Sequence, residues 1–300
     1  MISKQDDTKD ILDNEPSQNQ RSNRRFTIFL VIALIVILIG IQASRTIPEI
    51  MTASDYRNAM TFFDDGRYDE ARTAFLSLGE YADSKYYVLQ CQYYLAYQSA
   101  ERLFIQGNYK DARELFSQLG STDFLDTWER VNECTYRIAQ ETLISGDREE
   151  AYNLFRALED YRDSAQQMEA CLLPYPDSGV LYQNALYQST SVVLDFHTSP
   201  DVSPLYTKIY AEDTFVAALF LFGEEPIRIT LPAGSYTIKA AQGTLWFGEE
   251  QLFGSEGDYY LMLFNDSDSV LLNDNTSYAI TSSYESNGSI VNQPIDRESF

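Results

Sequence analysis

The sequence has few of the residues that most enzyme and metal sites require. Its 300 residues include one histidine and three cysteines. Histidine-dependent catalysis therefore has a single candidate, and a zinc site of cysteine and histidine has almost no material. Basic residues are also scarce: 22 Lys and Arg stand against 45 Asp and Glu, a net charge of −23. A nucleic-acid partner is not expected, because phosphate contacts need a basic surface.

Recognisable catalytic patterns are missing as well. The chain has no Gly-x-Ser-x-Gly or Ser-x-x-Lys motif and no phosphate-binding glycine loop. Strand alternation places His197 beside Asp195, but this pair lacks a nucleophile. Glu249 and Glu250 are adjacent acids, which usually point apart instead of forming a glycosidase pair. We therefore predict that the protein is not an enzyme and has no catalytic residue, no metal and no cofactor.

One long segment lacks charge altogether. No charged residue lies between Arg25 and Arg45, and residues 26–44 are long and apolar enough to cross ~30 Å of hydrocarbon as a helix. Basic residues gather on the N-terminal side, which places the N-terminus in the cytoplasm and residues 46–300 outside. The competing interpretation is a cleaved signal peptide, but the pairing of Ile41 with Ala43 makes a poor cleavage site.

We therefore predict an uncleaved, single-pass signal anchor in the cell membrane. A disordered cytoplasmic tail (residues 1–25) precedes it and a linker (residues 45–52) follows it. The 44% apolar fraction allows a sizeable core beyond the linker, and the length is sufficient for about two domains.

A motif that begins at a glycine occurs three times, as GRYDEARTAFLSL, GNYKDARELFSQL and GDREEAYNLFRAL. Each copy has Ala five residues after the glycine, Phe nine after it and another Ala seven before it. Glycine ends one helix in the left-handed conformation, and Ala and Phe form one face of the next helix. These positions are the predicted repeat core: Ala59, Gly66, Ala71, Phe75, Ala100, Gly107, Ala112, Phe116, Ala139, Gly146, Ala151 and Phe155.

A second signature follows each copy, in which an aromatic residue precedes x-Asp-Ser or x-Asp-Thr. The Asp-Ser or Asp-Thr pair predicts an N-cap. Seven residues after the Ser or Thr come Cys91, Cys134 and Cys171. A metal cluster and a disulfide are the functional alternatives for these cysteines. We predict small core residues instead, because equivalent positions in stacked repeats lie too far apart for a disulfide.

The motif Gly-x-Tyr-x-x-Ala-x-x-x-Phe resembles the tetratricopeptide repeat (TPR) over residues 53–175. The chain departs from that repeat at Arg148, which replaces the Tyr, and in glycine spacings of 41 and 39 residues. The resemblance implies an α-solenoid of three TPR-like repeats (residues 53–177) that binds a protein partner. The variant with Tyr-x-Asp-Ser and a trailing Cys is similar to repeats in membrane and envelope proteins of Gram-positive anaerobes of the clostridial group.

After residue 190 the pattern changes to short runs rich in β-branched and aromatic residues, separated by turn residues. This pattern predicts an all-β, sandwich-like domain at residues 191–290. Tyr182-x-x-Ala185 copies the start of a repeat, so we predict a capping helix at residues 178–190 and a flexible tail at residues 291–300. The fold class is then α+β and multidomain, with a single N-terminal transmembrane helix.

Two aromatic-Gly units flank two acids between Gly243 and Gly254. The aromatic rings either stack on sugars or peptides, or fold back to plug the end of the β domain. The candidate ligand surface comprises Trp246, Phe247, Glu249, Glu250, Tyr259 and Tyr260. Two functions follow: an extracytoplasmic envelope scaffold or adaptor whose repeats bind a protein partner, or a cell-wall or carbohydrate-binding protein that acts through the β domain.

Overall fold

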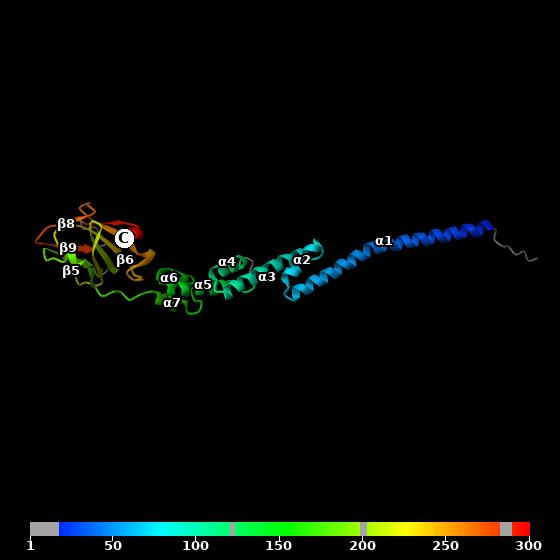
Figure 1. Cartoon of the computed structure of the whole chain (residues 1–300), viewed down its shortest axis with the longest axis horizontal. Helices are drawn as coiled ribbons and strands as arrows, with labels where there is room; N and C mark the ends of the chain where they lie inside the picture. Colours follow the sequence, from blue (N-terminus) through cyan, green and yellow to red (C-terminus); the bar gives the residue numbers. More distant parts are fainter. Residues whose placement is uncertain (1–17, 121–123, 199–202, 283–289) are drawn as a thin grey trace, which may run out of the picture. The chain divides into compact units, whose positions relative to one another are not determined.

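The computed structural model describes residues 18–120, 124–198, 203–282 and 290–300. The chain forms two units, Met1–Ser99 and Ala100–Phe300. In the described residues, helices come first and strands follow (Figure 1). The helices are α1 (Gln18–Asp64), α2 (Tyr68–Leu78), α3 (Ser84–Ile105), α4 (Tyr109–Gly120), α5 (Thr127–Ser145), α6 (Arg148–Ala157) and α7 (Ser164–Cys171). The strands are β1 (Gly179–Gln183), β2 (Val192–Thr198), β3 (Leu205–Ala211), β4 (Thr214–Leu221), β5 (Ile227–Leu231), β6 (Gly234–Gln242), β7 (Asp258–Phe264), β8 (Val270–Leu272), β9 (Thr276–Ser282) and β10 (Ile290–Pro294).

Helix α1 is continuous over 47 residues. From Phe26 onward it is long and apolar enough to cross a membrane, and its large apolar side chains up to Ile41 are exposed. Residues 45–52, predicted as a linker, and residues 18–25 of the predicted tail are part of this helix. The helix continues through Pro48, a residue that lacks a backbone N–H and ordinarily kinks or ends a helix. The rest of the predicted tail, residues 1–17, lies outside the described residues.

The three glycines end α1, α3 and α5 with positive φ angles, +74° at Gly66, +82° at Gly107 and +96° at Gly146. A short helix follows each of them, as the left-handed termination requires. The predicted alanines, phenylalanines and cysteines of the repeats are all at most 1% exposed. Two of the three sets form separate clusters, one around Phe75 and Cys91 and one around Phe155 and Cys171.

The Ser or Thr hydroxyl of each predicted N-cap pair closes the turn before its helix. Each helix begins at the Ser or Thr itself, whose side chain is buried and donates to the carbonyl of the aromatic residue three positions earlier. The bonds are Ser84 Oγ to Tyr81 O (2.6 Å), Thr127 Oγ1 to Phe124 O (2.8 Å) and Ser164 Oγ to Tyr161 O (2.6 Å). Asp126 and Asp163 stand at the N-cap positions of α5 and α7, as predicted, but their side chains make no capping hydrogen bond. The residue before each Asp adopts a left-handed conformation, and the hydroxyl closes the turn instead. These left-handed residues are Ala82, Leu125 and Arg162.

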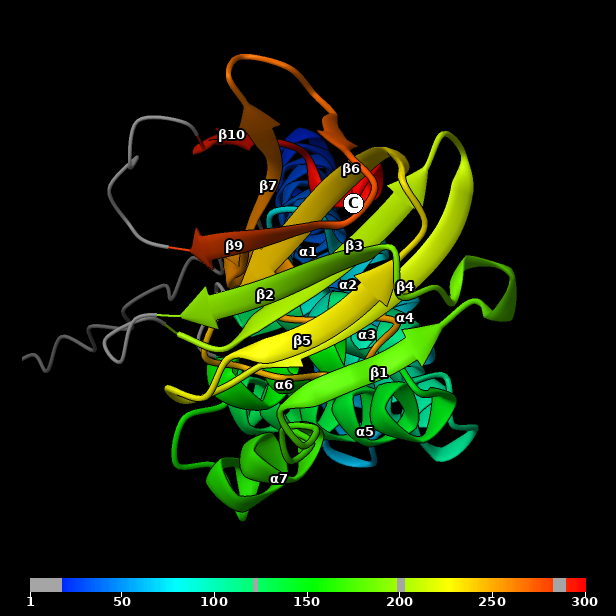
Figure 2. The same cartoon turned by 90° about the vertical axis from the view of Figure 1, so that its left-hand side faces the viewer.

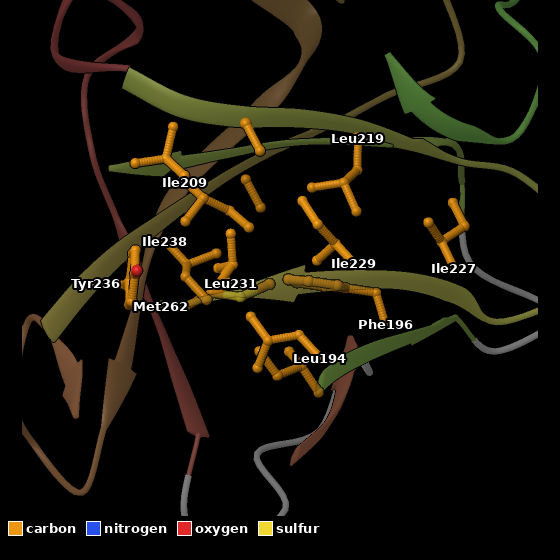
Figure 3. Packing of buried hydrophobic residues seen from close by; sticks show 14 of the residues in the cluster. Leu194, Phe196, Ile209, Leu219, Ile227, Ile229, Leu231, Tyr236, Ile238 and Met262 are labelled. Carbon is orange, nitrogen blue, oxygen red and sulfur yellow. The ribbon is translucent and has the colours of Figure 1, made fainter. Parts of the chain in front are cut away.

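The C-terminal strands form two sheets (Figure 2). The larger has the order β1-β4-β3-β6-β7-β10, with β8 also paired to β6, and the smaller has the order β5-β2-β9. The pairs are antiparallel except β2 with β9. Alternate residues of both sheets supply one buried cluster, to which Leu194, Ile209, Leu219, Ile229 and Ile238 belong (Figure 3).

Residues 178–190 do not form the predicted capping helix. They form strand β1 and a single 3-10 turn, Ala185–Tyr187. Strand β1 pairs with β4, and the ring of Tyr182 stacks on Phe215 with centroids 5.1 Å apart. The nearly fully buried strand β4 needs a partner for its backbone groups, and this long-range requirement outweighs the local Tyr-x-x-Ala pattern.

The predicted flexible tail at residues 291–300 is also ordered into the β region. Strand β10 pairs with β7, and the 3-10 turn η3 (Arg297–Ser299) follows it. The ring of Phe300 packs 5.6 Å from that of Tyr259. Pairing with β7 and burial of an aromatic ring provide the contacts that a free tail would lack.

Candidate functional site

The aromatic residues at 246 and 247 do not form a ligand surface. Trp246 is only 3% exposed and its ring packs against Phe220 and Phe253, with centroids 5.2 Å away in both cases. A Cβ on Gly243 would lie 2.6 Å from the Cβ of Phe253, so the glycine allows the loop to fold back onto the sheet. A ring this deeply buried cannot stack on a sugar, so Trp246 is a core residue and the plug interpretation holds.

Phe247 and its neighbours lie against the last helices. The ring of Phe247, which is buried, contacts that of Tyr152 in α6 with centroids 5.6 Å apart. The Leu173 N–H donates to the Trp246 carbonyl (2.9 Å), and the Tyr175 hydroxyl donates to the Thr244 carbonyl (2.6 Å). The loop between β6 and β7, residues 243–257, is therefore an internal junction between the helices and the larger sheet.

Polar contacts complete this junction at the N-terminus of α6. The Gln251 side chain makes three hydrogen bonds: its Oε1 accepts from the N–H groups of Arg148 (2.9 Å) and Glu149 (3.4 Å), and its Nε2 donates to Asp147 Oδ1 (2.8 Å). At the other end of α6, Arg156 pairs with Glu256 at 2.6 Å. A free N–H group at the start of a helix needs a partner, and the loop provides one.

Glu149 is the central acid of the junction. Its carboxylate accepts from the Ser255 N–H and pairs with Arg297. Burial tends to raise the pKa of Glu149, but the hydrogen bond from Ser255 and the Arg297 charge outweigh it and hold the pKa below its ordinary value. Arg297 also donates to the Gln251 carbonyl (3.0 Å), so one arginine links α6, the loop and the C-terminal turn.

The other predicted surface residues are dispersed. Glu249 and Glu250 are exposed, and the Tyr206 hydroxyl lies 3.5 Å from Glu249 Oε2. Burial, together with the charge of Glu249, raises the pKa of Tyr206 to about 12. Tyr259 and Tyr260 lie on β7 and are buried, unlike the two acids. The six predicted residues therefore do not share one surface.

Tyr259 and Tyr260 instead contribute to a pocket of about 650 Å³, which we call the β10 pocket. It is lined by Gln242, Ser255, Gly257, Asp258, Tyr259, Tyr260, Asn292, Pro294, Ile295, Asp296, Arg297 and Glu298. The sequence analysis missed most of these residues, because they come from the ends of three strands and from a segment predicted to be a flexible tail. The acidic pattern at 296 and 298 was the available signal.

The catalytic and metal candidates do not assemble into a site. The Asp195 carboxylate pairs with Arg228 through contacts of 2.7 and 2.9 Å, so the arginine holds both of its oxygens. Within the described ranges, no group of three or more His, Cys, Asp or Glu residues could hold a metal ion. The three cysteines are free and buried, and burial raises the pKa of Cys134 and of Cys171 to about 11.

The helices of the second unit carry two surface features. A pocket of about 320 Å³ surrounds Glu133, whose carboxylate contacts Arg137 (2.9 Å), Arg162 (2.6 Å) and the Tyr161 hydroxyl (2.9 Å). At the first turn of α5, Trp128 is 57% exposed and Leu125 is also exposed. Paired charges fill the first feature, whereas the second is an apolar surface open to solvent.

Comparison with protein-family models, curated proteins and solved structures finds no match to this chain. Function is therefore inferred from the arrangement of the side chains.

Proposed function

We propose that the protein is a non-enzymatic, membrane-anchored scaffold or adaptor of a Gram-positive cell envelope, whose helical repeats bind a protein partner. Residues 26–44 anchor it as a single-pass segment with a cytoplasmic N-terminus, and residues 46–300 lie outside. The long apolar α1 and the preceding arginines support this topology. In this proposal the helices are three TPR-like repeats and the two sheets are a sandwich-like module.

The observation that carries the proposal is the exposed apolar surface on the repeat helices. Trp128 has more than half of its side chain in solvent, next to exposed Leu125. Ile105 and Ile144, each two residues before a repeat glycine, are also exposed. Tryptophan is highly buried on average and is among the residues that contribute most to protein interfaces. A protein partner that covers Trp128 accounts for this exposure.

The junction around α6 supports a scaffold over an enzyme. The contacts of Asp147, Glu149 and Arg156 with the 243–257 loop fix the β module to the last repeat. The result is one interlocked body in the second unit, which suits a protein that holds its partner at a fixed position.

The test replaces Trp128 in the full-length chain, expressed in its membrane and purified in mild detergent. Trp128→Ser should remove a co-purifying protein that the unchanged chain retains in stoichiometric amount. Leu271→Ser is the matched control, because Leu271 is equally exposed but lies on β8, and it should retain the partner. Partner retention by Trp128→Ser, with an unchanged circular dichroism spectrum, would refute the proposed surface.

Cell-wall or carbohydrate binding through the β module is the second candidate. The buried Trp246 and Phe247 do not support it, but the β10 pocket beside Tyr260 does, since it is large enough for a small glycan. Co-sedimentation of the detergent-purified chain with purified sacculi tests this function separately. Sedimentation that Trp128→Ser leaves unchanged would favour it.

A further inference from the structure

We propose that the β10 pocket binds a ligand that carries a primary ammonium group. Its volume of about 650 Å³ lies within the ~300–1,000 Å³ range of small-molecule sites. This inference is independent of the partner surface on the repeats, since the pocket belongs to the β module. Its basis is the shape, the charge and the support of the pocket walls.

The floor of the pocket is held by strand pairing. Gln242 at the end of β6 pairs directly with Asp258 at the start of β7, and Tyr260 of β7 pairs with Pro294 of β10. The Tyr260 hydroxyl lies 3.3 Å from Gln242 Oε1. Backbone ladders on both sides of β7 therefore fix the positions from which these side chains project, and the pocket is preorganised.

The lining of the pocket carries more negative than positive charge. Asp258, Asp296 and Glu298 line it, and in the described part of the chain none of the three forms an ion pair. Arg297 is the single basic residue of the lining, but Glu149 and the Gln251 carbonyl hold its guanidinium. Lys239 also reaches this turn, and its ammonium donates to the Ser299 carbonyl (2.5 Å). A cation that enters meets three carboxylates that are not held in ion pairs.

The other residues of the pocket lining provide apolar contacts and hydrogen-bonding groups. Pro294 and Ile295 offer apolar surface, while the amides of Gln242 and Asn292 offer hydrogen-bond donors and acceptors. An ammonium group on a short carbon framework fits this combination, as in a lysine side chain of a peptide or in an amino sugar. The two sources share the ammonium group, and the experiment below separates them.

Glu149 acts on the pocket from outside as a positioning residue. It does not line the pocket, but its ion pair with Arg297 anchors the turn that carries Asp296 and Glu298. Loss of this anchor should loosen that wall. Ligand binding in the β module is thereby linked to helix α6, which belongs to the last repeat.

The test is isothermal titration calorimetry with the full-length chain in mild detergent. The probes are trilysine, a glucosamine tetramer and, as a neutral control, its N-acetylated form. We expect at least one ammonium probe to bind, and Asp258→Asn and Glu298→Gln each to weaken it at least about fivefold. Glu225→Gln removes the same charge from an exposed turn of the same module and should change the affinity less than about twofold.

Each outcome decides for or against the pocket. Binding of trilysine alone identifies a peptide ligand, and binding of the glucosamine tetramer alone identifies an amino sugar. Weaker binding in Glu149→Gln, together with a reduced pH dependence, supports the positioning role. The proposal is overturned if neither ammonium probe binds at millimolar concentration, if Glu225→Gln weakens binding as much as Asp258→Asn, or if the acetylated tetramer binds equally well.

Discussion

Gly254 sits at the centre of the junction and has no room for a side chain. Its φ is +69°, and a Cβ there would lie 2.8 Å from Phe247 Cε2 and 2.9 Å from both Cδ and Oε1 of Glu149. Neither neighbour can move easily, because the Phe247 ring is packed on Tyr152 and the Glu149 carboxylate is held by its two donors. Gly254→Ala should therefore loosen the contact between α6 and the loop.

The expected loss has two parts. The left-handed backbone costs an alanine about 1–2 kcal/mol, and overpacking a filled site costs about 1–3 kcal/mol more. Gly254→Ala should lower the free energy of unfolding by about 2–5 kcal/mol. Gly223→Ala is the matched control, since Gly223 has φ +98° but nothing within 4 Å of its Cβ, and it should show the backbone part alone.

The assay is urea unfolding of the full-length chain in mild detergent, followed by tryptophan fluorescence. A Trp128→Phe background leaves buried Trp246 as the single reporter, and its emission shifts to the red when the junction opens. The backbone at Gly223 is at least as strained for an alanine as the backbone at Gly254. A larger loss of unfolding free energy in Gly254→Ala therefore reports the crowding of its Cβ and not the backbone conformation. Equal losses for Gly254→Ala and Gly223→Ala, within about 0.5 kcal/mol, would refute the reasoning.

Three further predictions concern single side chains. Thr207 is fully buried and its hydroxyl has no hydrogen-bond partner among the described residues. Thr207→Val should therefore raise the free energy of unfolding by about 1 kcal/mol in the same assay. A lower free energy of unfolding in Thr207→Val would show that the hydroxyl makes a stabilising hydrogen bond. The pKa of Glu149 is lower in the folded state than its ordinary value. Its carboxylate therefore stabilises the folded state at neutral pH, and this stabilisation is lost as the pH falls below about 4.5. In Glu149→Gln the free energy of unfolding, measured with urea, should fall less steeply over this acid range. With pKa values of about 11, Cys134 and Cys171 should resist a disulfide-exchange reagent at pH 8 until urea is added, and rapid labelling of the native chain would contradict their burial.

Local patterns predicted the repeat helices well. A left-handed glycine and an Ala-Phe spacing of four residues act within one or two helical turns, so their structural effect can be read along the chain. The same holds for the uncharged run that begins at Phe26. The hydroxyls at 84, 127 and 164 show the limit of such patterns, since their spacing identified the helix start but not which groups they bond.

The sequence by itself determined which repeat positions are buried, which glycines end α1, α3 and α5, and where the long apolar segment lies. Each of these depends on residues close together in the chain. Only the tertiary structure decided that residues 178–190 add a strand to β4, that Phe300 packs on the sheet, and that Trp246 is core. It also created the β10 pocket, because strand pairing and burial bring together groups far apart in sequence, and the free energy gained there outweighs weak local preferences.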